Sequence, residues 1–442
     1  MLRPASFTFG TYTIDPARSA ISFTYRVGFE SGRVRTYTDR LIFPDVTPGL
    51  WEKVPKAVLE PTLQALLLML GINYWCVFRT SNIYIERFAL TREQAEFWNT
   101  LYLNGLGEFF FDMKIDFDNL IVFPYDASLS APEPRGLGRA AGQLGRALLL
   151  NGAGKDSILS AEILKAASIP FDFFVFAPTP AHNRIASLVG AKTISVNRRR
   201  DPRLNLIGAL CRTSSAYPSV STFTFVATLL AELLGYDSII FSNERSADFG
   251  NLTYLGLSVN HQWCKSSEAE KLINDYIRRF ITPDISTRSL LRSYSELEIV
   301  RRFAHYPQYL KQVTSCNAYF WLSRPEQLFL SRKRAYWCKT CPKCVFLFAC
   351  FAAYLPKKEV VEMFGADLYQ RKRLLPLTRR ILGLEGFKPL DCVGEPEEMI
   401  LAMHYAVRGK EYAGEPAMNM FEQSFPVDYN FKEIERKVLS NI

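Results

Sequence analysis

The spacing of apolar side chains divides the chain into stretches with different periodicities. Apolar residues at positions 21, 23, 25 and 27 alternate with polar residues at 22, 24 and 26, which is typical of a half-buried β-strand. An apolar run over residues 59–71 predicts a helix, and residues 124–138, rich in Pro, Gly and Ser, indicate a linker. We therefore expect an N-terminal α+β domain, rich in strands, over residues 1–140.

Residues 141–290 alternate short apolar runs with helical patterns. Strands are predicted at residues 147–151, 171–178, 192–197 and 238–246, and helices at 155–167, 182–190 and 221–235. Strands separated by helices indicate a parallel sheet, whose ligands bind at the carboxyl ends of the strands. The expected fold class is α/β, with a parallel-sheet core over 141–290 and a mainly helical region over 291–442.

Composition narrows the class of protein only slightly. The 442 residues carry a net charge of +9, which suits an anionic partner such as a nucleotide, a phosphorylated substrate or nucleic acid. The basic run Arg198–Arg200 is expected on a solvated face or against phosphates. The N-terminus lacks the pattern of a secretory signal, and the apolar runs are shorter than the roughly 20 residues that span a bilayer. We expect a cytoplasmic protein without a membrane partner.

A glycine-rich turn, "NGAGKDS", joins the first strand of the parallel core to the following helix. Gly152 and Gly154 allow the backbone N–H groups to surround an anion at the helix N-terminus. Lys155 adds a positive charge, Ser157 adds a hydroxyl group, and Asp156 either caps the helix or takes part in magnesium binding. The turn matches neither the Walker A nor the G-x-G-x-x-G spacing. The alternatives are a phosphate site and an ordinary tight turn.

This turn resembles the S-G-G-x-D-S loop of the PP-loop ATP pyrophosphatases, which cleave ATP to AMP and pyrophosphate. Gly152 stands in place of the first serine and Ala153 in place of the first glycine. The resemblance implies a HUP-like nucleotide-binding fold for the parallel core.

A cysteine group follows in the helical region. Cys338, Cys341 and Cys344 have C-x2-C-x2-C spacing, and four thiolates at such spacings can form a closed tetrahedral zinc site. An iron–sulfur cluster and buried thiols without a metal remain open. The 7-cyano-7-deazaguanine synthases, also PP-loop proteins, have a similar four-cysteine zinc site, and this resemblance makes Cys316 the fourth ligand. Cys350 is the competitor, but its apolar helical setting indicates a core residue.

Three further segments could carry chemistry. Glu244 and Arg245 lie in "SNERSADFGN", directly after a predicted strand, and form either a site or a solvated loop. His261 lies in "SVNHQWCKS", which follows the functional edge of the sheet. Cys392 and Glu395 lie in "KPLDCVGEPEEM", which by itself is typical of a helix start with acidic residues at its N-terminal end.

Taken together, these segments resemble one family, the ATP-dependent UDP-N-acetylmuramoyl-L-alanyl-L-glutamate epimerases of bacteria. The matching stretches run in order from about residue 100 to about residue 400. They are "LYLNGLGEF", "GAGKDS", "SNERSADFGNLTYLGLSVNHQWCKS", "SELEIVRRFAHYP", "SCN" with "WCKTCPKC", and "KPLDCVGEPEE". The resemblance implies an enzyme that uses ATP and magnesium to invert the terminal L-glutamate of a UDP-linked muramoyl dipeptide in peptidoglycan precursor synthesis.

The resemblance also implies roles for individual residues. ATP phosphates are expected on Gly152, Gly154, Lys155 and Ser157, with Asp156 as a magnesium ligand. Candidates for the base that moves the α-proton are Glu244, His261, Cys392 and Glu395, and the sequence does not choose among them. Substrate contacts are expected from Arg245, Asn260 and Lys265. Structural zinc is expected on Cys316, Cys338, Cys341 and Cys344.

Two other functions compete with this interpretation. Another PP-loop enzyme, such as an amide-forming or thiol-transferring ligase of the 7-cyano-7-deazaguanine synthase or tRNA-modification type, would also adenylate its substrate but leave glutamate stereochemistry unchanged. A zinc-ribbon nucleic-acid binder would use the basic runs on phosphates but gives no role to "NGAGKDS". We therefore expect no nucleic-acid partner.

Overall fold

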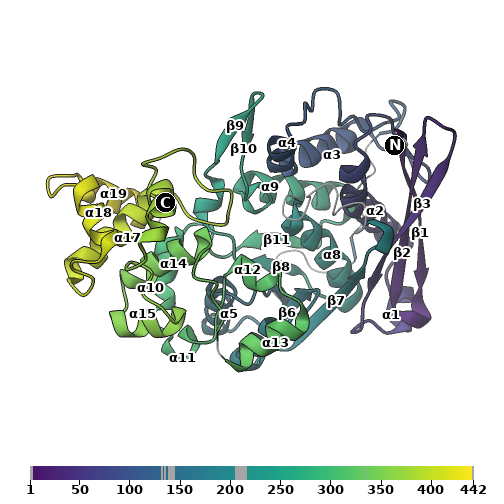
Figure 1. Cartoon of the computed structure of the whole chain (residues 1–442). Coiled ribbons are helices and arrows are strands. Elements are labelled where there is room, and N and C mark those ends of the chain that lie inside the picture. Colours follow the sequence, from purple (N-terminus) through teal and green to yellow (C-terminus); the bar gives the residue numbers. More distant parts are fainter. Residues whose placement is uncertain are drawn as a thin grey trace.

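The computed structural model describes residues 3–130, 133, 136, 137, 145–204, 217–333 and 335–440. Its central feature is a nine-stranded sheet with the order β11-β8-β5-β6-β7-β3-β2-β1-β4 (Figure 1). β9 (Leu252–Tyr254) and β10 (Leu257–Val259) form a separate hairpin that projects from the body of the molecule. Helices pack around the sheet, so the expected α/β class is confirmed.

One half of the sheet is parallel and comes from the middle of the chain. In chain order its strands are β5 (Ala147–Leu150), β6 (Phe171–Phe176), β7 (Thr193–Arg199), β8 (Ser238–Phe241) and β11 (Ser286–Ser289). They are connected by helices that include α5 (Lys155–Ala166), α6 (Pro180–Val189), α8 (Ser219–Leu234) and α9 (Ser267–Tyr276). The first of these strands, β5, lies between β6 and β8, so the strand order reverses at β5, as it does in doubly wound α/β proteins.

The other half of the sheet comes from the N-terminal residues. β1 (Pro4–Asp15), β2 (Ala20–Phe29) and β3 (Val34–Ile42) form an antiparallel meander, and β4 (Ile83–Ile85) pairs with β1. The predicted strand is confirmed in β2, where buried and half-buried residues alternate. β3 pairs with β7, so the sheet continues across the proposed boundary near residue 140. The division into three domains stays a prediction.

A buried ion pair joins the two halves of the sheet. Arg198 of β7 donates from Nε to both carboxylate oxygens of Asp39 of β3, at 3.1 and 3.0 Å. Asp39 is fully buried and the Arg198 side chain is 12% exposed. The expectation that Arg198 lies on a solvated face or against phosphates is therefore wrong, because the pairing of two distant strands buries it against a carboxylate.

The apolar run at residues 59–71 lies in α2 (Lys56–Phe78), a helix of 23 residues. α2 is long and apolar enough to cross a membrane by length and composition, but 83% of its apolar window is buried inside the protein. It packs against β1 and α8. Gly71 permits this close approach, because a Cβ atom there would lie 2.8 Å from Phe9 Cδ1 and 2.9 Å from Tyr25 Cε1.

The parallel strands are buried on both faces. Leu148 of β5 belongs to the core that contains α2 and α8, whereas the next residue, Leu149, belongs to the core of the C-terminal helices. The longer of these helices are α10 (Glu296–Phe303), α13 (Arg324–Arg332), α14 (Pro342–Ala352), α15 (Lys357–Phe364), α17 (Pro396–Gly409), α18 (Pro416–Ser424) and α19 (Phe431–Leu439). The expected helical C-terminal region is thus confirmed, and Figure 1 shows it at the end of the molecule opposite β1–β3.

Candidate functional site

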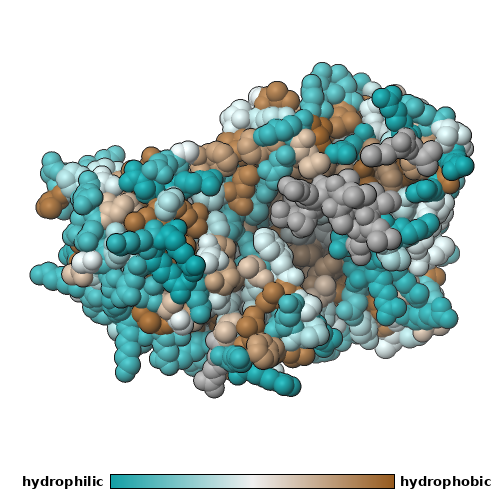
Figure 2. All heavy atoms as spheres, in the orientation of Figure 1, coloured by the Kyte–Doolittle hydropathy of each residue, from teal (hydrophilic) through white to brown (hydrophobic). Residues whose placement is uncertain are grey.

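A cavity of about 510 Å³ lies at the carboxyl ends of β5, β6 and β8, where the strand order reverses. Part of the cavity wall comes from the parallel sheet and its loops: Leu150, Asn151, Gly152, Gly154, Asp156, Ser157, Phe176, Ala177, Thr179, His182, Ser219, Val220, Phe223, Ser242, Asn243, Glu244 and Lys265. The C-terminal region contributes the rest of the wall: Ser315, Asn317, Phe320, Lys343 and Cys392. We call it the switch-point cavity. Figure 2 shows a hollow near the centre of one face of the molecule, between the N-terminal strands and the C-terminal helices. Ligands of doubly wound sheets bind at this position.

The glycine-rich turn forms part of the cavity wall. Gly152 is exposed, and a Cβ atom there would meet nothing within 4 Å. A Cβ atom on Gly154 would lie 2.9 Å from Ser315 Oγ, so the glycine allows the C-terminal region to approach closely. Ala153 has φ +57°, and its N–H donates to Asn151 Oδ1 at 2.8 Å. The turn therefore bends through a left-handed residue immediately before the N-terminus of α5.

A chain of buried charges lies behind this turn. The Lys155 side chain is 1% exposed and pairs with Glu296 and with Asp156, whose Oδ1 is 2.5 Å from Lys155 Nζ. Glu296 also pairs with Lys343. Burial alone would raise the pKa of Glu296, but the two ammonium groups outweigh burial and lower it to about 2. One buried carboxylate thus pairs with two lysines that come from different halves of the chain.

A second polar group surrounds Cys392. Lys265 Nζ lies 3.4 Å from Cys392 Sγ, and His261 also hydrogen-bonds to the Cys392 side chain. His261 Nδ1 is 2.5 Å from Glu108 Oε2 of α4 (Gly107–Met113). The structure therefore brings a thiol, an imidazole and a carboxylate into one row, with an ammonium group beside the thiol.

The protonation states of this row follow from its neighbours. Burial alone would raise the pKa of Cys392, but the nearby cations, chiefly Lys265 and His261, lower it to about 7. Burial alone would lower the pKa of His261, but hydrogen bonds to Cys392 and Glu108 raise it to about 10. Both shifts favour a thiolate beside an imidazolium, which is the state in which cysteine acts as a base or nucleophile.

Backbone contacts keep the Cys392 loop in place. The Asn251 side chain accepts from the His261 N–H at 2.8 Å and donates to the carbonyls of Lys388 and Pro389, at 3.2 and 2.9 Å. The side-chain amide of Asn317 donates to Asp391 Oδ1, 2.5 Å away. One asparagine therefore fixes His261 and the segment before Cys392 together.

The structure does not bring all the predicted residues to the cavity. The predicted residues that line the cavity are Gly152, Gly154, Asp156, Ser157, Glu244, Lys265 and Cys392. Lys155 and His261 lie behind lining residues. Arg245 donates to carbonyls of Lys437, Val438 and Ser440 at the end of α19. Glu395 is the N-cap of α17 and lies 3.4 Å from Lys437 Nζ. Asn260 donates to the Ala247 carbonyl and lines two other, smaller cavities.

Three charged residues that pair with site residues were not among the predicted ones. They are Glu108, Glu296 and Lys343, and no local spacing distinguishes them as site residues. Each acts on a partner that is distant in sequence: Glu108 on His261, Glu296 on Lys155, and Lys343 on Glu296. Only their position inside segments that resemble the family could have drawn attention to them.

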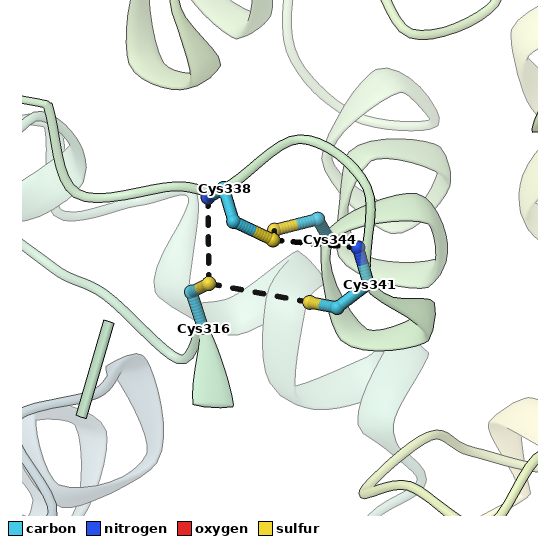
Figure 3. A group of neighbouring side chains, drawn as sticks. All are labelled: Cys316, Cys338, Cys341 and Cys344. Atoms are coloured by element: carbon cyan, nitrogen blue, oxygen red, sulfur yellow. Dashed lines mark hydrogen bonds between the residues drawn. The ribbon is translucent and has the colours of Figure 1, made fainter. Parts of the chain in front are cut away.

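The four predicted zinc ligands come together in one group (Figure 3). The Sγ atoms of Cys316 and Cys341 are 4.0 Å apart, those of Cys338 and Cys344 are 3.7 Å apart, and all four lie within 4.8 Å of one another. A zinc tetrahedron with Zn–S bonds of about 2.3 Å has edges of about 3.8 Å. The group therefore fits a single ion such as zinc and leaves no room at its centre for a multi-iron cluster.

Two backbone hydrogen bonds to sulfur distinguish this group from ordinary buried thiols. The N–H of Cys338 donates to Cys316 Sγ at 3.4 Å, and the N–H of Cys341 donates to Cys338 Sγ at 3.3 Å, contacts that favour thiolates. Cys350, the competing ligand, is fully buried in the apolar part of α14. The cysteine group also adjoins the cavity, because Cys316 lies between two lining residues, Ser315 and Asn317.

The fold and the cavity together define a doubly wound α/β protein with a candidate ligand cavity where the strand order reverses and, beside it, a four-cysteine group that could bind a metal such as zinc. Comparison of the sequence identifies the family. Residues 2–290 match the MurL N-terminal domain and residues 312–435 match the MurL C-terminal domain. The chain belongs to the MurL family.

Curated relatives match nearly the whole chain. A protein of a Micromonospora species is 31% identical over 431 residues, which cover 96% of this chain and 92% of the relative. A protein of Xanthomonas oryzae pathovar oryzae is 30% identical over 363 residues, which cover 82% of this chain and 78% of the relative. A protein of Salinispora tropica is 31% identical over 409 residues, which cover 91% of this chain and 84% of the relative. Each carries the name UDP-N-acetyl-alpha-D-muramoyl-L-alanyl-L-glutamate epimerase.

Proposed function

We propose that this protein is an epimerase that inverts the terminal L-glutamate of UDP-N-acetylmuramoyl-L-alanyl-L-glutamate to D-glutamate, a step in peptidoglycan precursor synthesis. Membership of the MurL family and the names of its relatives support the reaction. We further propose that the reaction consumes ATP and releases AMP and pyrophosphate. The observation that carries this proposal is a single cavity lined both by the glycine-rich turn and by the thiol of Cys392.

The chemistry of glutamate explains the need for ATP. The α-proton lies next to a carboxylate, so its removal would put a second negative charge beside the first. Transfer of AMP to the carboxylate removes that charge and provides a carbonyl into which the electron pair can move. A base then takes the α-proton, and a proton returns to the opposite face. Hydrolysis of the acyl-adenylate releases AMP and makes the inversion irreversible.

The glycine-rich turn is proposed to bind the phosphates of ATP. Gly152 leaves the backbone open towards the cavity, and the first N–H groups of α5 have no partners within the helix. Ser157 lines the cavity and supplies a hydroxyl group. Lys155 is held in ion pairs behind the turn, so its contribution is a positive field rather than a free ammonium group. Asp156, a carboxylate at the cavity wall, would hold Mg²⁺, which neutralises phosphate charge when bound.

The other end of the cavity is proposed to bind the glutamate. Lys265 and Lys343 provide positive charge for carboxylate or phosphate oxygens. Of the candidates for the base, Glu244 and Cys392 line the cavity. His261 contacts Cys392 from behind. The predicted roles of Arg245, Asn260 and Glu395 receive no support from their positions outside the cavity wall.

Chiral analysis of glutamate tests the proposed function. The purified protein is incubated with UDP-N-acetylmuramoyl-L-alanyl-L-glutamate, ATP and magnesium, and the product is hydrolysed before separation of D- and L-glutamate. D-Glutamate is expected only when ATP is present, together with AMP and pyrophosphate. The matched control contains ADP in place of ATP.

Two results would contradict the proposal in different ways. Glutamate that stays in the L form while ATP is cleaved with another acceptor points to an adenylating ligase. Inversion without ATP means that the adenylation mechanism is wrong but the epimerase assignment is right.

A further inference from the structure

We infer that Cys392 is the group that moves the α-proton on one face of the activated glutamate, and that Glu108 is a positioning residue that acts on Cys392 through His261. The inference rests on the proposed function. It chooses one base among the candidates that the sequence leaves open, and it adds a carboxylate for which the sequence gives no signal.

The first support is location. The α-carbon is bonded directly to the carboxyl carbon, whose oxygen receives AMP, so the base must lie in the cavity that holds the reacting phosphate. Cys392 lines the switch-point cavity together with Gly152 and Ser157. The Cys392 loop comes from the C-terminal region and the turn from the parallel sheet, and both contribute to the wall of this one cavity.

The second support is the engagement of other titratable groups in the cavity wall. Asp156 pairs with Lys155. His182 accepts the N–H of Thr179 at the start of α6, and burial lowers the pKa of its imidazole to about 4, which leaves a weak base. Glu244 is the remaining competitor, because its buried carboxylate lines the same cavity. It is therefore compared directly with Cys392 in the experiment below.

The third support is the arrangement behind the thiol. Glu108 is 8% exposed and does not line the cavity; its carboxylate contacts His261 at 2.5 Å. A carboxylate in this position orients the imidazole and favours its protonated form, and the imidazolium in turn favours a thiolate. Lys265, 3.4 Å from Cys392 Sγ, has the same effect from another side.

The surroundings of Cys392 are charged on every side. Besides His261, its titratable or charged neighbours are Lys265 and Cys264 from the turn at 263–265, Lys343 from α14, Glu244 after β8, and Lys388 and Asp391 from its own loop. Cations predominate, and the pKa of Cys392 falls to about 7 despite its burial.

The proposed step balances as follows. The Cys392 thiolate takes the α-proton of the glutamyl adenylate, so that a C–H bond breaks, an S–H bond forms, and the electron pair moves into the carbonyl to give an enolate. An acid on the opposite face, which water reprotonates, supplies the proton for the new C–H bond, and the Cys392 thiol returns its proton to water. Water then cleaves the acyl–phosphate bond, which releases AMP and restores the carboxylate.

Exchange of the α-proton with D₂O tests the assignment. Cys392→Ala and Cys392→Ser are compared with Glu244→Gln and with the control Cys264→Ala, which changes a thiol outside the switch-point cavity. Mass spectrometry measures deuterium in the L- and D-glutamyl substrates, and ATP–pyrophosphate exchange measures adenylation separately. We expect both Cys392 variants to keep adenylation and to lose α-proton exchange in at least one epimer by about 10²- to 10⁴-fold.

The outcomes separate this inference from the proposed function. Exchange of both epimers at wild-type rates in the Cys392 variants overturns the assignment of Cys392 while the epimerase stands. A wild-type protein that neither adenylates the substrate nor exchanges its α-proton overturns the proposed function and, with it, this inference.

Alkylation tests the role of Glu108 without any turnover. The rate at which iodoacetamide modifies Cys392 is followed by peptide mass spectrometry from pH 5 to pH 10. In the wild type the rate should rise with a midpoint near pH 7. Glu108→Gln removes the charge that favours imidazolium, so the thiolate is less stabilised and the midpoint should move to higher pH.

Glu96→Gln is the matched control, because Glu96 is an exposed carboxylate on the preceding helix, α3 (Arg92–Gly105). Its midpoint should equal that of the wild type. A wild-type midpoint near pH 9, or the same midpoint in Glu108→Gln and Glu96→Gln, overturns the positioning role.

Discussion

Ala153 occupies a backbone conformation that disfavours every residue with a side chain. Its φ is +57°, in the left-handed region, where an L-residue costs roughly 1–2 kcal/mol. The S-G-G-x-D-S loop that the turn resembles has glycine at this position, so the structure explains the preference for glycine in physical terms. The alanine keeps the turn but strains it.

Ala153→Gly should therefore leave the stability nearly unchanged, although Ala153 is buried. Relief of roughly 1–2 kcal/mol of strain offsets the extra chain entropy of glycine, about 0.5–1 kcal/mol, and the loss of a buried methyl group, about 0.8 kcal/mol. Thermal unfolding measures the difference. The control is Ala167→Gly at the exposed end of α5, where φ is −83° and glycine should destabilise instead. A loss of stability in both variants would contradict the strain at Ala153.

Glu296 should carry a pH-dependent part of the stability. Its pKa falls from 4.5 to about 2 in the folded protein, so its contribution is fully present above pH 4.5 and is lost as the pH falls towards 2. The shift corresponds to on the order of 3 kcal/mol. Glu296→Gln also leaves two buried ammonium groups without their shared partner, so it should strongly destabilise the protein at pH 7.

Urea unfolding of the wild type and Glu296→Gln at pH 7, 5 and 4 checks this expectation. The difference in free energy of unfolding should shrink as the pH falls below 5. The control is Glu362→Gln, which removes an exposed partner of Lys311 and should change little at any pH. A difference between wild type and Glu296→Gln that does not depend on pH would show that the carboxylate is not ionised by its lysines.

Residue types and local spacing identify some site residues and not others. The turn at 152–157 and the cysteines at 338, 341 and 344 are recognisable because their chemistry depends on neighbours within a few positions. Glu108 is 153 positions from His261, and Glu296 is 141 positions from Lys155. No local pattern marks such pairs, because only the folded chain brings them together.

At the level of secondary structure, local sequence predicts where strands form but not which strands pair. The alternation in β2 and the apolar runs of β5 and β6 predict strands correctly, because burial follows directly from side-chain period. The pairing of β3 with β7 joins segments about 150 residues apart and has no counterpart in local sequence. Arg198 was misjudged for this reason, since its partner Asp39 is supplied by that pairing.

The loop and helix that carry the cysteines also carry part of the cavity wall. Ser315 and Asn317 flank Cys316, and Lys343 precedes Cys344 at the start of α14. We therefore expect one zinc ion per chain, measured by elemental analysis. Cys316→Ala should lose the zinc and weaken substrate binding, because the three lining residues lose their fixed position.

Cys350→Ala is the matched control for the metal, because Cys350 lies on the same helix as Cys344 but is buried in apolar surroundings. It should keep the full zinc content, although the lost sulfur lowers stability. Loss of zinc from Cys350→Ala with retention in Cys316→Ala would exchange the two assignments.

For the whole molecule, the two cores share the parallel sheet. β5 contributes Leu148 to one core and Leu149 to the other, and the Arg198–Asp39 pair joins the two halves of the sheet. We therefore expect one cooperative unfolding transition rather than two.

Two probes in different cores check the cooperativity. The reaction of Cys76 with a thiol reagent reports on the core around α2, and the reaction of Cys350 reports on the core of the C-terminal helices, each followed by peptide mass spectrometry. The two curves should have the same midpoint in urea. Midpoints that differ would mean that the cores unfold independently.

The charge chain from Lys155 through Glu296 to Lys343 also has a consequence for synthesis on the ribosome. Lys155 emerges together with Asp156, while its buried partner Glu296 and the residues that cover the pair are still untranslated. A buried ammonium group without its carboxylate is costly, so the nascent chain should keep this region hydrated and open. The site is completed only after Glu296, Lys343 and Cys392 have left the exit tunnel. An unfinished chain would therefore lack the assembled cavity, because part of its wall has not yet been made.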